Sequence, residues 1–298
     1  MALMNRTMTR AAAWLFLAVL ALVAAPAGAQ RYEQGLLWRV EGPGAVASHL
    51  FGTIHLDDPR VAELPAPVER ALKEARSVTV ELSLETANVI ALASRMLYTD
   101  GRDLASVAGG DLFSRTASIT AKLGIPEAAV RLFKPWAAAV MLMMPQQNPE
   151  NVLDYRLVRM AAAQNKALYE LESVEEQVDA FEGMTEQDQV TMLRQAVDEY
   201  ARMPQTIERM LKAYLARDLA MMWHISRENE SGDPGIRRLN EVFAQRVLDV
   251  RNARMADRLQ ARLKEGGAFV AVGALHLYGD RGVPALLERR GWRITRVY

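Results

Sequence analysis

Two histidines of this chain stand in the same short motif, Gly-x-x-His, close to opposite ends of the sequence. Residues 51–55 read FGTIH, and residues 272–276 read VGALH. In each copy an apolar, strand-like run precedes the glycine, which permits close backbone approach in the loop that follows. Because the chain has only four histidines, the repetition singles out His55 and His276 as candidate metal ligands or acid–base groups at one rim of a sheet.

The pattern of apolar residues predicts the strands that would position these histidines. The predicted strands are Leu37 to Val40, Val46 to Phe51, Ser77 to Leu82, Lys166 to Leu171, Ala268 to Val272 and Trp292 to Val297. In open α/β sheets, ligands bind outside the carboxyl ends of the strands. We therefore expect His55 and His276 at the same edge of one sheet, with their nitrogens within roughly 10 Å of each other, as shared ligation requires.

The middle of the chain has helical periodicity from about Thr86 to Glu265, apart from the brief strand at 166–171. One helix is expected after Asp57-Asp58-Pro59 and another from Pro204 through Met222. The fold is thus predicted to be α/β (α+β), with a central mixed β-sheet built from the N- and C-terminal segments. A large helical insertion, about 86–265, would lie between those segments.

The N-terminus has the features of a Sec signal peptide. Arg6 and Arg10 precede an apolar run from Ala11 to Ala25, and Ala27-Gly28-Ala29 is an A-x-A cleavage site. Cleavage before Gln30 would release one domain, residues 30–298, into the periplasm or the medium, with only transient membrane contact through the signal peptide. An uncleaved N-terminal anchor is the alternative.

Composition excludes several classes of function. The chain has no cysteine, which excludes disulfides, thiolate metal ligands and a cysteine nucleophile. Removal of residues 1–29 would leave 34 basic and 36 acidic residues, a net charge of about −2 that disfavours nucleic-acid binding. The 15 methionines are expected to fill helix cores rather than to bind copper.

Beyond these motifs, the sequence from about Leu36 to Val297 resembles the TraB/PrgY/GumN family, which belongs to a TIKI-like superfamily with erythromycin-esterase-like and ChaN-like proteins. The resemblance is carried by residues 36–61, by SVTVELSLE at 77–85, by Arg251-Asn252 and by residues 269–297. The family motifs are two Gly-x-x-His sites and a glutamate on the strand after the first helix. The resemblance therefore adds Glu81 to His55 and His276, and marks Arg251 as a further candidate.

Two mechanisms fit these residues. Two imidazoles and a carboxylate suffice to hold a catalytic divalent metal, and nitrogen and oxygen ligands suit Zn, Mn or Co. Without a metal, His55 or His276 would act as general base on water, with Glu81 orienting it and Arg251 stabilising the oxyanion. In the structural alternative, Glu81 is a surface carboxylate and Arg251 a salt-bridged helix residue.

The resemblance implies a function without fixing it. TIKI proteins are described as metal-dependent peptidases, and bacterial family members have links to peptide-pheromone shutdown and polysaccharide gene clusters. We expect an exported, metal-dependent hydrolase that acts on a peptide or another small substrate. The alternatives are a non-catalytic protein that sequesters a peptide, a metal or haem, and an accessory factor in envelope polysaccharide biosynthesis. The sequence leaves the oligomeric state open.

Overall fold

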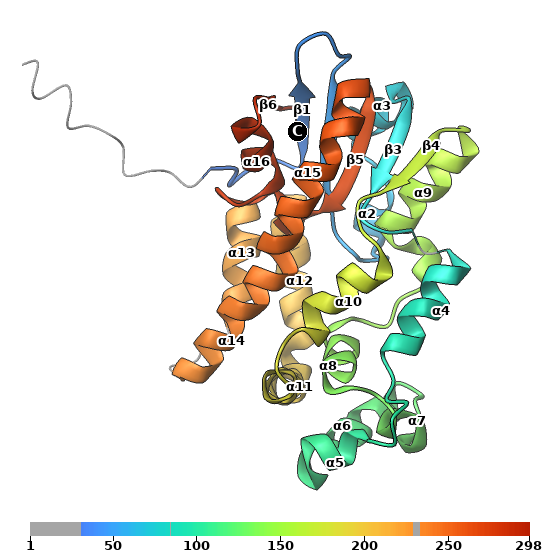
Figure 1. Cartoon of the computed structure of the whole chain (residues 1–298), viewed down its shortest axis with the longest axis vertical. Coiled ribbons are helices and arrows are strands. Elements are labelled where there is room, and N and C mark those ends of the chain that lie inside the picture. The colour runs from blue at the N-terminus through green and yellow to red at the C-terminus, as the bar shows by residue number, and fades with distance from the viewer. Residues whose placement is uncertain (1–30, 84, 229–232) are drawn as a thin grey trace, which may run out of the picture. The chain divides into compact units, whose positions relative to one another are not determined.

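The computed structural model describes residues 31–83, 85–228 and 233–298 (Figure 1). The predicted signal peptide, residues 1–29, lies outside these ranges. Within them, none of the helices combines the length and the apolar character that crossing a membrane requires.

A six-stranded mixed sheet forms the centre of the fold, with strand order β4-β3-β5-β2-β1-β6. The strands β2, β5, β3 and β4 run parallel, whereas β1 is antiparallel to both β2 and β6. The prediction of an α/β fold around a mixed sheet is confirmed. The N- and C-terminal segments supply every strand of this sheet except β4, which comes from the middle of the chain. The strand bounds are β1 Leu37–Glu41, β2 Ser48–Thr53, β3 Ser77–Val80, β4 Ala167–Glu170, β5 Ala268–Gly273 and β6 Arg293–Arg296.

The register of β2 on β5 brings the two Gly-x-x-His loops together. Gly52 lies opposite Val272 and Thr53 lies opposite Gly273. Because the two strands are parallel neighbours, the loops that follow them leave the sheet at the same edge. The prediction that the two motif strands lie in one sheet, with their loops at the same edge, is therefore confirmed, and the two strands are in addition direct neighbours.

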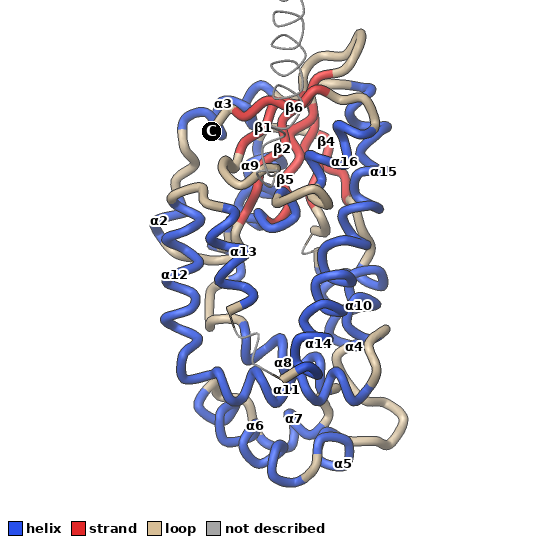
Figure 2. The backbone as a smooth tube through the Cα atoms, turned by 90° about the vertical axis from the view of Figure 1, so that its left-hand side faces the viewer, coloured by secondary structure: helices blue, strands red, loops and turns tan. Residues whose placement is uncertain are grey.

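Helices account for most of the chain between β3 and β5. In the side view of Figure 2 most of these helices lie on one side of the strands, whereas α9 and α15 pack beside the strands. The helices of the described residues are α2 Pro59–Ala62, α3 Ala66–Glu74, α4 Thr86–Arg95, α5 Leu104–Ala108, α6 Gly110–Lys122, α7 Glu127–Arg131, α8 Pro135–Met143, α9 Leu153–Ala163, α10 Val174–Glu182, α11 Glu186–Glu199, α12 Met203–Leu215, α13 Leu219–Arg227, α14 Pro234–Ala244, α15 Val250–Glu265 and α16 Val283–Arg289, with 3₁₀ turns η1 Pro149–Asn151, η2 Tyr200–Arg202 and η4 Ala274–Leu277 and a π-helical turn η3 Gln245–Asp249.

Two helices predicted as single segments are each divided in two. The first consists of α2 and α3, because Pro65 at the N-cap of α3 cannot continue a preceding helix. The second consists of α12 and α13, because Arg217 has a φ of 60° and the Asp218 side chain caps the new helix at Met221. Both corrections concern local breaks that an apolar stripe does not reveal.

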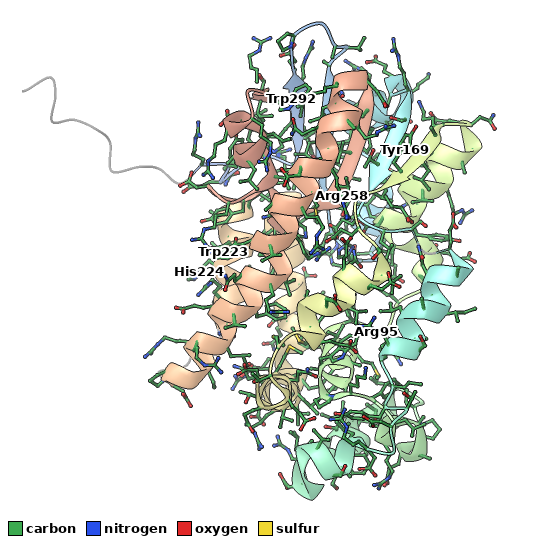
Figure 3. All side chains as sticks on the ribbon, in the orientation of Figure 1. Arg95, Tyr169, Trp223, His224, Arg258 and Trp292 are labelled. Carbon is green, nitrogen blue, oxygen red and sulfur yellow. The ribbon has the colours of Figure 1, made fainter. Side chains whose placement is uncertain are left out.

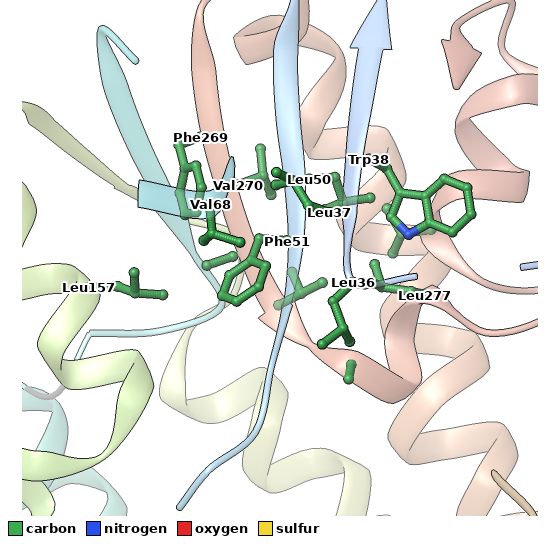
Figure 4. Close-up of a cluster of buried hydrophobic side chains, with 14 of the residues drawn as sticks. Leu36, Leu37, Trp38, Leu50, Phe51, Val68, Leu157, Phe269, Val270 and Leu277 are labelled. Atoms are coloured by element: carbon green, nitrogen blue, oxygen red, sulfur yellow. The ribbon is translucent and has the colours of Figure 1, made fainter. Parts of the chain in front are cut away.

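The first apolar core is formed mainly by β2, β5 and the helices that pack on them (Figure 4). Phe51 on β2 and Phe269 on β5 have ring centroids 5.9 Å apart. Every residue of β5 except Gly273 is buried, as expected for a parallel strand covered on both faces. A second apolar core lies among the helices α5, α6, α8, α11 and α14. The site loops therefore leave a rigid, fully packed strand.

The glycine of the first motif is required because the second motif packs against it. A Cβ atom on Gly52 would lie 2.7 Å from Leu277 Cδ1 and 3.0 Å from Ala274 Cα, both on η4. The Gly52 carbonyl also accepts a hydrogen bond of 2.9 Å from the buried Tyr214 hydroxyl. A side chain at position 52 would therefore push the two loops apart.

We predict that Gly52→Ala lowers the free energy of unfolding by about 1–3 kcal/mol, the usual cost of overpacking a well-filled site. Gly273→Ala is the matched control, because a Cβ on Gly273 meets its nearest atom at 3.4 Å, an ordinary contact distance. Urea denaturation of both variants measures the difference. Equal stability of the two variants would contradict the close packing of the loops.

Candidate functional site

His55 follows β2 and is oriented by an aspartate on α9. The Nδ1 atom of His55 lies 2.8 Å from Asp154 Oδ2, and the Thr53 hydroxyl donates to Asp154 Oδ1 at 2.6 Å. Because the carboxylate only accepts, Nδ1 carries the proton and Nε2 is left to face the site. The pair has the arrangement of the histidine and aspartate in many hydrolytic sites.

Glu81 comes directly after β3, and both of its oxygens are bonded. Oε1 accepts from the backbone N–H of Gly273 at 2.6 Å, and Oε2 accepts from Arg251 Nη2 at 2.6 Å. The Glu81 side chain is only 11% exposed. The interpretation of Glu81 as a surface carboxylate is therefore wrong, because β3 ends at Val80 and the next side chain turns toward the neighbouring loops.

Arg251 on α15 is held between Glu81 and a second glutamate, Glu172, which follows β4. Its Nε lies 3.1 and 3.0 Å from the two Glu172 oxygens, and its Nη2 also reaches Glu172 Oε2 at 2.6 Å. Nη1 donates to the Val247 carbonyl at 3.3 Å. Four of the five N–H groups of Arg251 are thereby used, so this arginine positions Glu81 more readily than it binds a ligand.

His276 lies in η4, after β5, and is buried. Its Nδ1 is 2.6 Å from Asn252 Oδ1, and the Asn252 amide nitrogen donates to the Arg281 carbonyl at 2.9 Å. Since the Asn252 oxygen accepts, Nδ1 of His276 carries the proton and Nε2 presents a lone pair. This Nε2 atom lies 3.6 Å from Glu81 Oε1.

The three motif residues converge on Gly273. A Cβ atom placed there would lie 3.4 Å from Glu81 Oε1, 3.5 Å from His276 Cδ2 and 3.5 Å from His55 Nε2. His55 Nε2 and His276 Cδ2 are therefore no more than about 7 Å apart. The absence of a side chain at Gly273 leaves open the space that these three groups face.

The charges at the centre of the site are fixed by the same contacts. Burial alone would raise the pKa of Glu81, but His276, Arg251, His55 and the Gly273 N–H outweigh it and lower that pKa to about 2. Burial lowers the pKa of His276 to about 4, although Glu81 opposes this change. At neutral pH the ionised carboxylate of Glu81 thus faces the neutral Nε2 of His276. Both atoms are hydrogen-bond acceptors, so they need a donor or a cation between them.

His55 has the opposite electrostatic environment. The Asp154 carboxylate raises the pKa of His55 to about 9, against the opposing effect of burial. The side chain is nevertheless 53% exposed, so water and salt screen this attraction and the pKa falls toward its ordinary value as ionic strength rises. At low ionic strength and neutral pH, His55 is the protonated histidine of the pair.

The donors fit a divalent cation in their chemistry. The 3.6 Å between His276 Nε2 and Glu81 Oε1 is close to the spacing of about 3.4 Å for two ligands of one tetrahedral ion. His55 Nε2 would be the third ligand. Over the described part of the chain, no three His, Asp or Glu side chains are already gathered as a metal cluster, so His55 would have to move closer to complete one.

Sequence reasoning found four residues of this arrangement and missed two. His55, Glu81, His276 and Arg251 all lie at the carboxyl edge of the sheet, joined by the contacts given above. Asp154 gave no signal, because its pairing with His55 spans 99 positions. Glu172 directly follows the predicted strand Lys166 to Leu171, and its place at a strand end was a usable signal.

Comparison with known proteins identifies the family. A profile of the TraB/PrgY/gumN family matches residues 36–296. The chain belongs to this family. It is 28% identical to uncharacterized protein YbaP of Shigella flexneri and 27% identical to that of Escherichia coli strain K12, in each case over 261 residues that cover 83% of this chain and 89% of the relative. No solved structure matches the chain.

Both Gly-x-x-His motifs fall inside the segment that matches the TraB/PrgY/gumN profile, as do Asp154 and Glu172. The matched segment also contains all six strands and begins one residue before β1. The candidate site therefore lies entirely within the region that matches the family.

We predict that the two site histidines titrate far apart. At low ionic strength, as the pH falls from 10, His55 gains its proton first, near pH 9, and His276 stays neutral until about pH 4. The ring C2–H signals of the four histidines in the NMR spectrum report this directly, with assignment by single His→Gln variants. Asp154→Asn should lower the pKa of His55 without moving that of His276. A His276 pKa near 6.5 would contradict the buried environment.

Proposed function

We propose that this protein is an exported hydrolase that cleaves peptides, with His55, Glu81 and His276 as its catalytic residues. The observation that supports the proposal most directly is the convergence of the three side chains on Gly273. Nε2 of the neutral His276 and Oε1 of the ionised Glu81 are hydrogen-bond acceptors 3.6 Å apart. Together they suit the binding of a water molecule that acts as the nucleophile. The half-exposed His55 gives a substrate access from solvent.

In the proposed reaction, a water oxygen bonded by Glu81 and His276 attacks the carbonyl carbon of the peptide bond. The water proton passes to His276 Nε2 or to Glu81 as the new C–O bond forms. The C–N bond then breaks, and the leaving amine takes a proton from Nε2–H of His55. Asp154 holds the His55 ring in the orientation for that transfer.

A divalent ion bound by His276 and Glu81, with His55 as the third ligand, would lower the pKa of the attacking water and polarise the carbonyl. Arg251 and Asn252 would then act through the ligands that they orient. Such partners fix the tautomer and direction of the ligands, and their loss typically weakens a metal site 10- to 100-fold.

We predict that His55→Ala, His276→Ala and Glu81→Gln each reduce kcat/KM for peptide hydrolysis by at least about 100-fold, since each removes an acid–base group. Peptide-library cleavage by the purified mature protein measures this loss. Gly273→Ala should have the same effect, because its methyl group would fill the space between the three side chains.

The matched controls are His49→Ala and His224→Ala. His49 lies on β2, four residues before its end, and His224 on α13 has a side chain that is 70% exposed, so both variants should keep full activity.

Elemental analysis with and without chelator separates the two mechanisms. Activity that survives chelation rejects the metal, whereas absence of cleavage with every peptide rejects the hydrolase and favours sequestration.

Export rests on the signal-like N-terminus, and we predict that the mature chain begins at Gln30 in the periplasmic fraction. Intact-mass measurement of the protein from cell fractions tests this directly. Protein that retains Met1 and stays with the membrane would contradict cleavage and support the anchor.

A further inference from the structure

A pocket lined by apolar side chains lies among helices of the middle region, apart from the candidate catalytic site. It has a volume of about 140 Å³, close to that of an apolar cavity of about 150 Å³ that accommodates benzene. Its apolar walls come from α8, α11, α12 and α14 and consist of Met143, Met192, Met203, Leu239, Phe243 and Ala196. A single apolar side chain fits a space of this size.

The walls combine fixed and adaptable surfaces. Leu239 is 2% exposed and Met192 is 5% exposed. Phe243 packs on Phe181 with ring centroids 6.0 Å apart. Met143 is 39% exposed, which places a flexible thioether at the open side. Methionine side chains adapt to ligands of different shape, so the pocket suits a class of apolar side chains rather than one.

The remaining lining residues are polar, and they suit a peptide backbone. They are Gln195, Glu199, Ser226 and Asn240. The carboxylate of Glu199 is paired with Arg202 at 2.9 Å, and the Ser226 hydroxyl donates to the Trp223 carbonyl at 2.7 Å. The two amides can therefore donate and accept, whereas the hydroxyl can only accept. An apolar lining with a few polar groups is the usual composition of a small-ligand pocket.

Two helices connect this pocket to the catalytic site. Asn240 and Arg251 stand eleven positions apart on the continuous helical run α14-η3-α15, which corresponds to about 16 Å along the axis. On α13, Trp223 (labelled in Figure 3) lies three residues before Ser226. The Trp223 ring stacks on the ring of Tyr278, with centroids 5.4 Å apart. Tyr278 is two residues beyond His276 in the chain.

From this geometry we infer that the pocket binds an apolar side chain of the peptide substrate, about four to five residues from the bond that is cleaved. The spacing follows because four to five residues of an extended peptide, at roughly 3.3 Å each, span about 13 to 17 Å. The inference rests on the proposed peptide hydrolysis for its spacing. Occupation of the pocket by the side chain can be measured without any cleavage.

Binding is tested with the full-length mature protein carrying ¹³C-methyl methionine, because Met143, Met192 and Met203 report on the pocket. A hexapeptide amide of glycine and serine with one central leucine should shift these three NMR signals, and the all-polar hexapeptide should not. Ser226→Trp fills the pocket from an exposed position and should weaken leucine-peptide binding by at least about tenfold.

His224→Trp is the matched control, since His224 is exposed on the same helix but lies about 200° around it from Ser226. It should leave binding unchanged. In a cleavage series, leucine moved along the peptide should raise kcat/KM most at four to five residues from the cleaved bond, and Ser226→Trp should abolish that preference.

Unshifted methionine signals with the leucine peptide, or full binding by Ser226→Trp, would overturn the inference. A leucine preference at another distance would overturn the spacing. Shifted methionine signals without cleavage of any peptide would support the pocket and reject the hydrolase, so the two failures are distinguishable.

Discussion

The buried ion network of Glu81, Arg251 and Glu172 is the interaction on which the site geometry depends. It joins the ends of β3 and β4 to α15, and its side chains are 11%, 11% and 0% exposed. Charges this deeply buried require partners of opposite charge. Loss of one partner of such a pair typically lowers the free energy of unfolding by about 3–5 kcal/mol. The direction of the Glu81 carboxylate is therefore set by three segments of the chain at once, which keeps Oε1 on the Gly273 N–H.

The order of the sheet extends this constraint to both histidines. Because β5 lies between β3 and β2, the loop after Gly273 has Glu81 on one side and the His55 loop on the other. The close contact of Gly52 with Ala274 and Leu277 holds the two loops together, so a shift of one changes the other. The catalytic candidates behave as one unit supported by a packed strand.

Much of this arrangement is predictable from sequence because it follows strand ends. Parallel strands place His55, Glu81 and His276 at one edge once the strands are recognised. Asp154 is different, because its contact with His55 depends on how α9 packs, and no local pattern encodes a pairing across 99 positions. The apolar pattern does not predict the helix breaks at Pro65 and Arg217 for a related reason. Apolar periodicity continues across these positions, although helix capping and backbone conformation end one helix and begin another there.

The duplicated motif explains where His55 and His276 lie, and the hydrogen-bond partner of each histidine explains its protonation. His55 is half exposed beside a carboxylate, whereas His276 is buried beside the neutral amide of Asn252. The same Gly-x-x-His sequence thus holds one imidazole with a pKa raised to about 9 and another with a pKa lowered to about 4. The proposed acid–base hydrolysis would need one group that gives a proton while another accepts one, and environments that push two pKa values apart can supply such a pair. Two copies of one motif can divide these roles only because different helices, α9 and α15, provide the residues behind them.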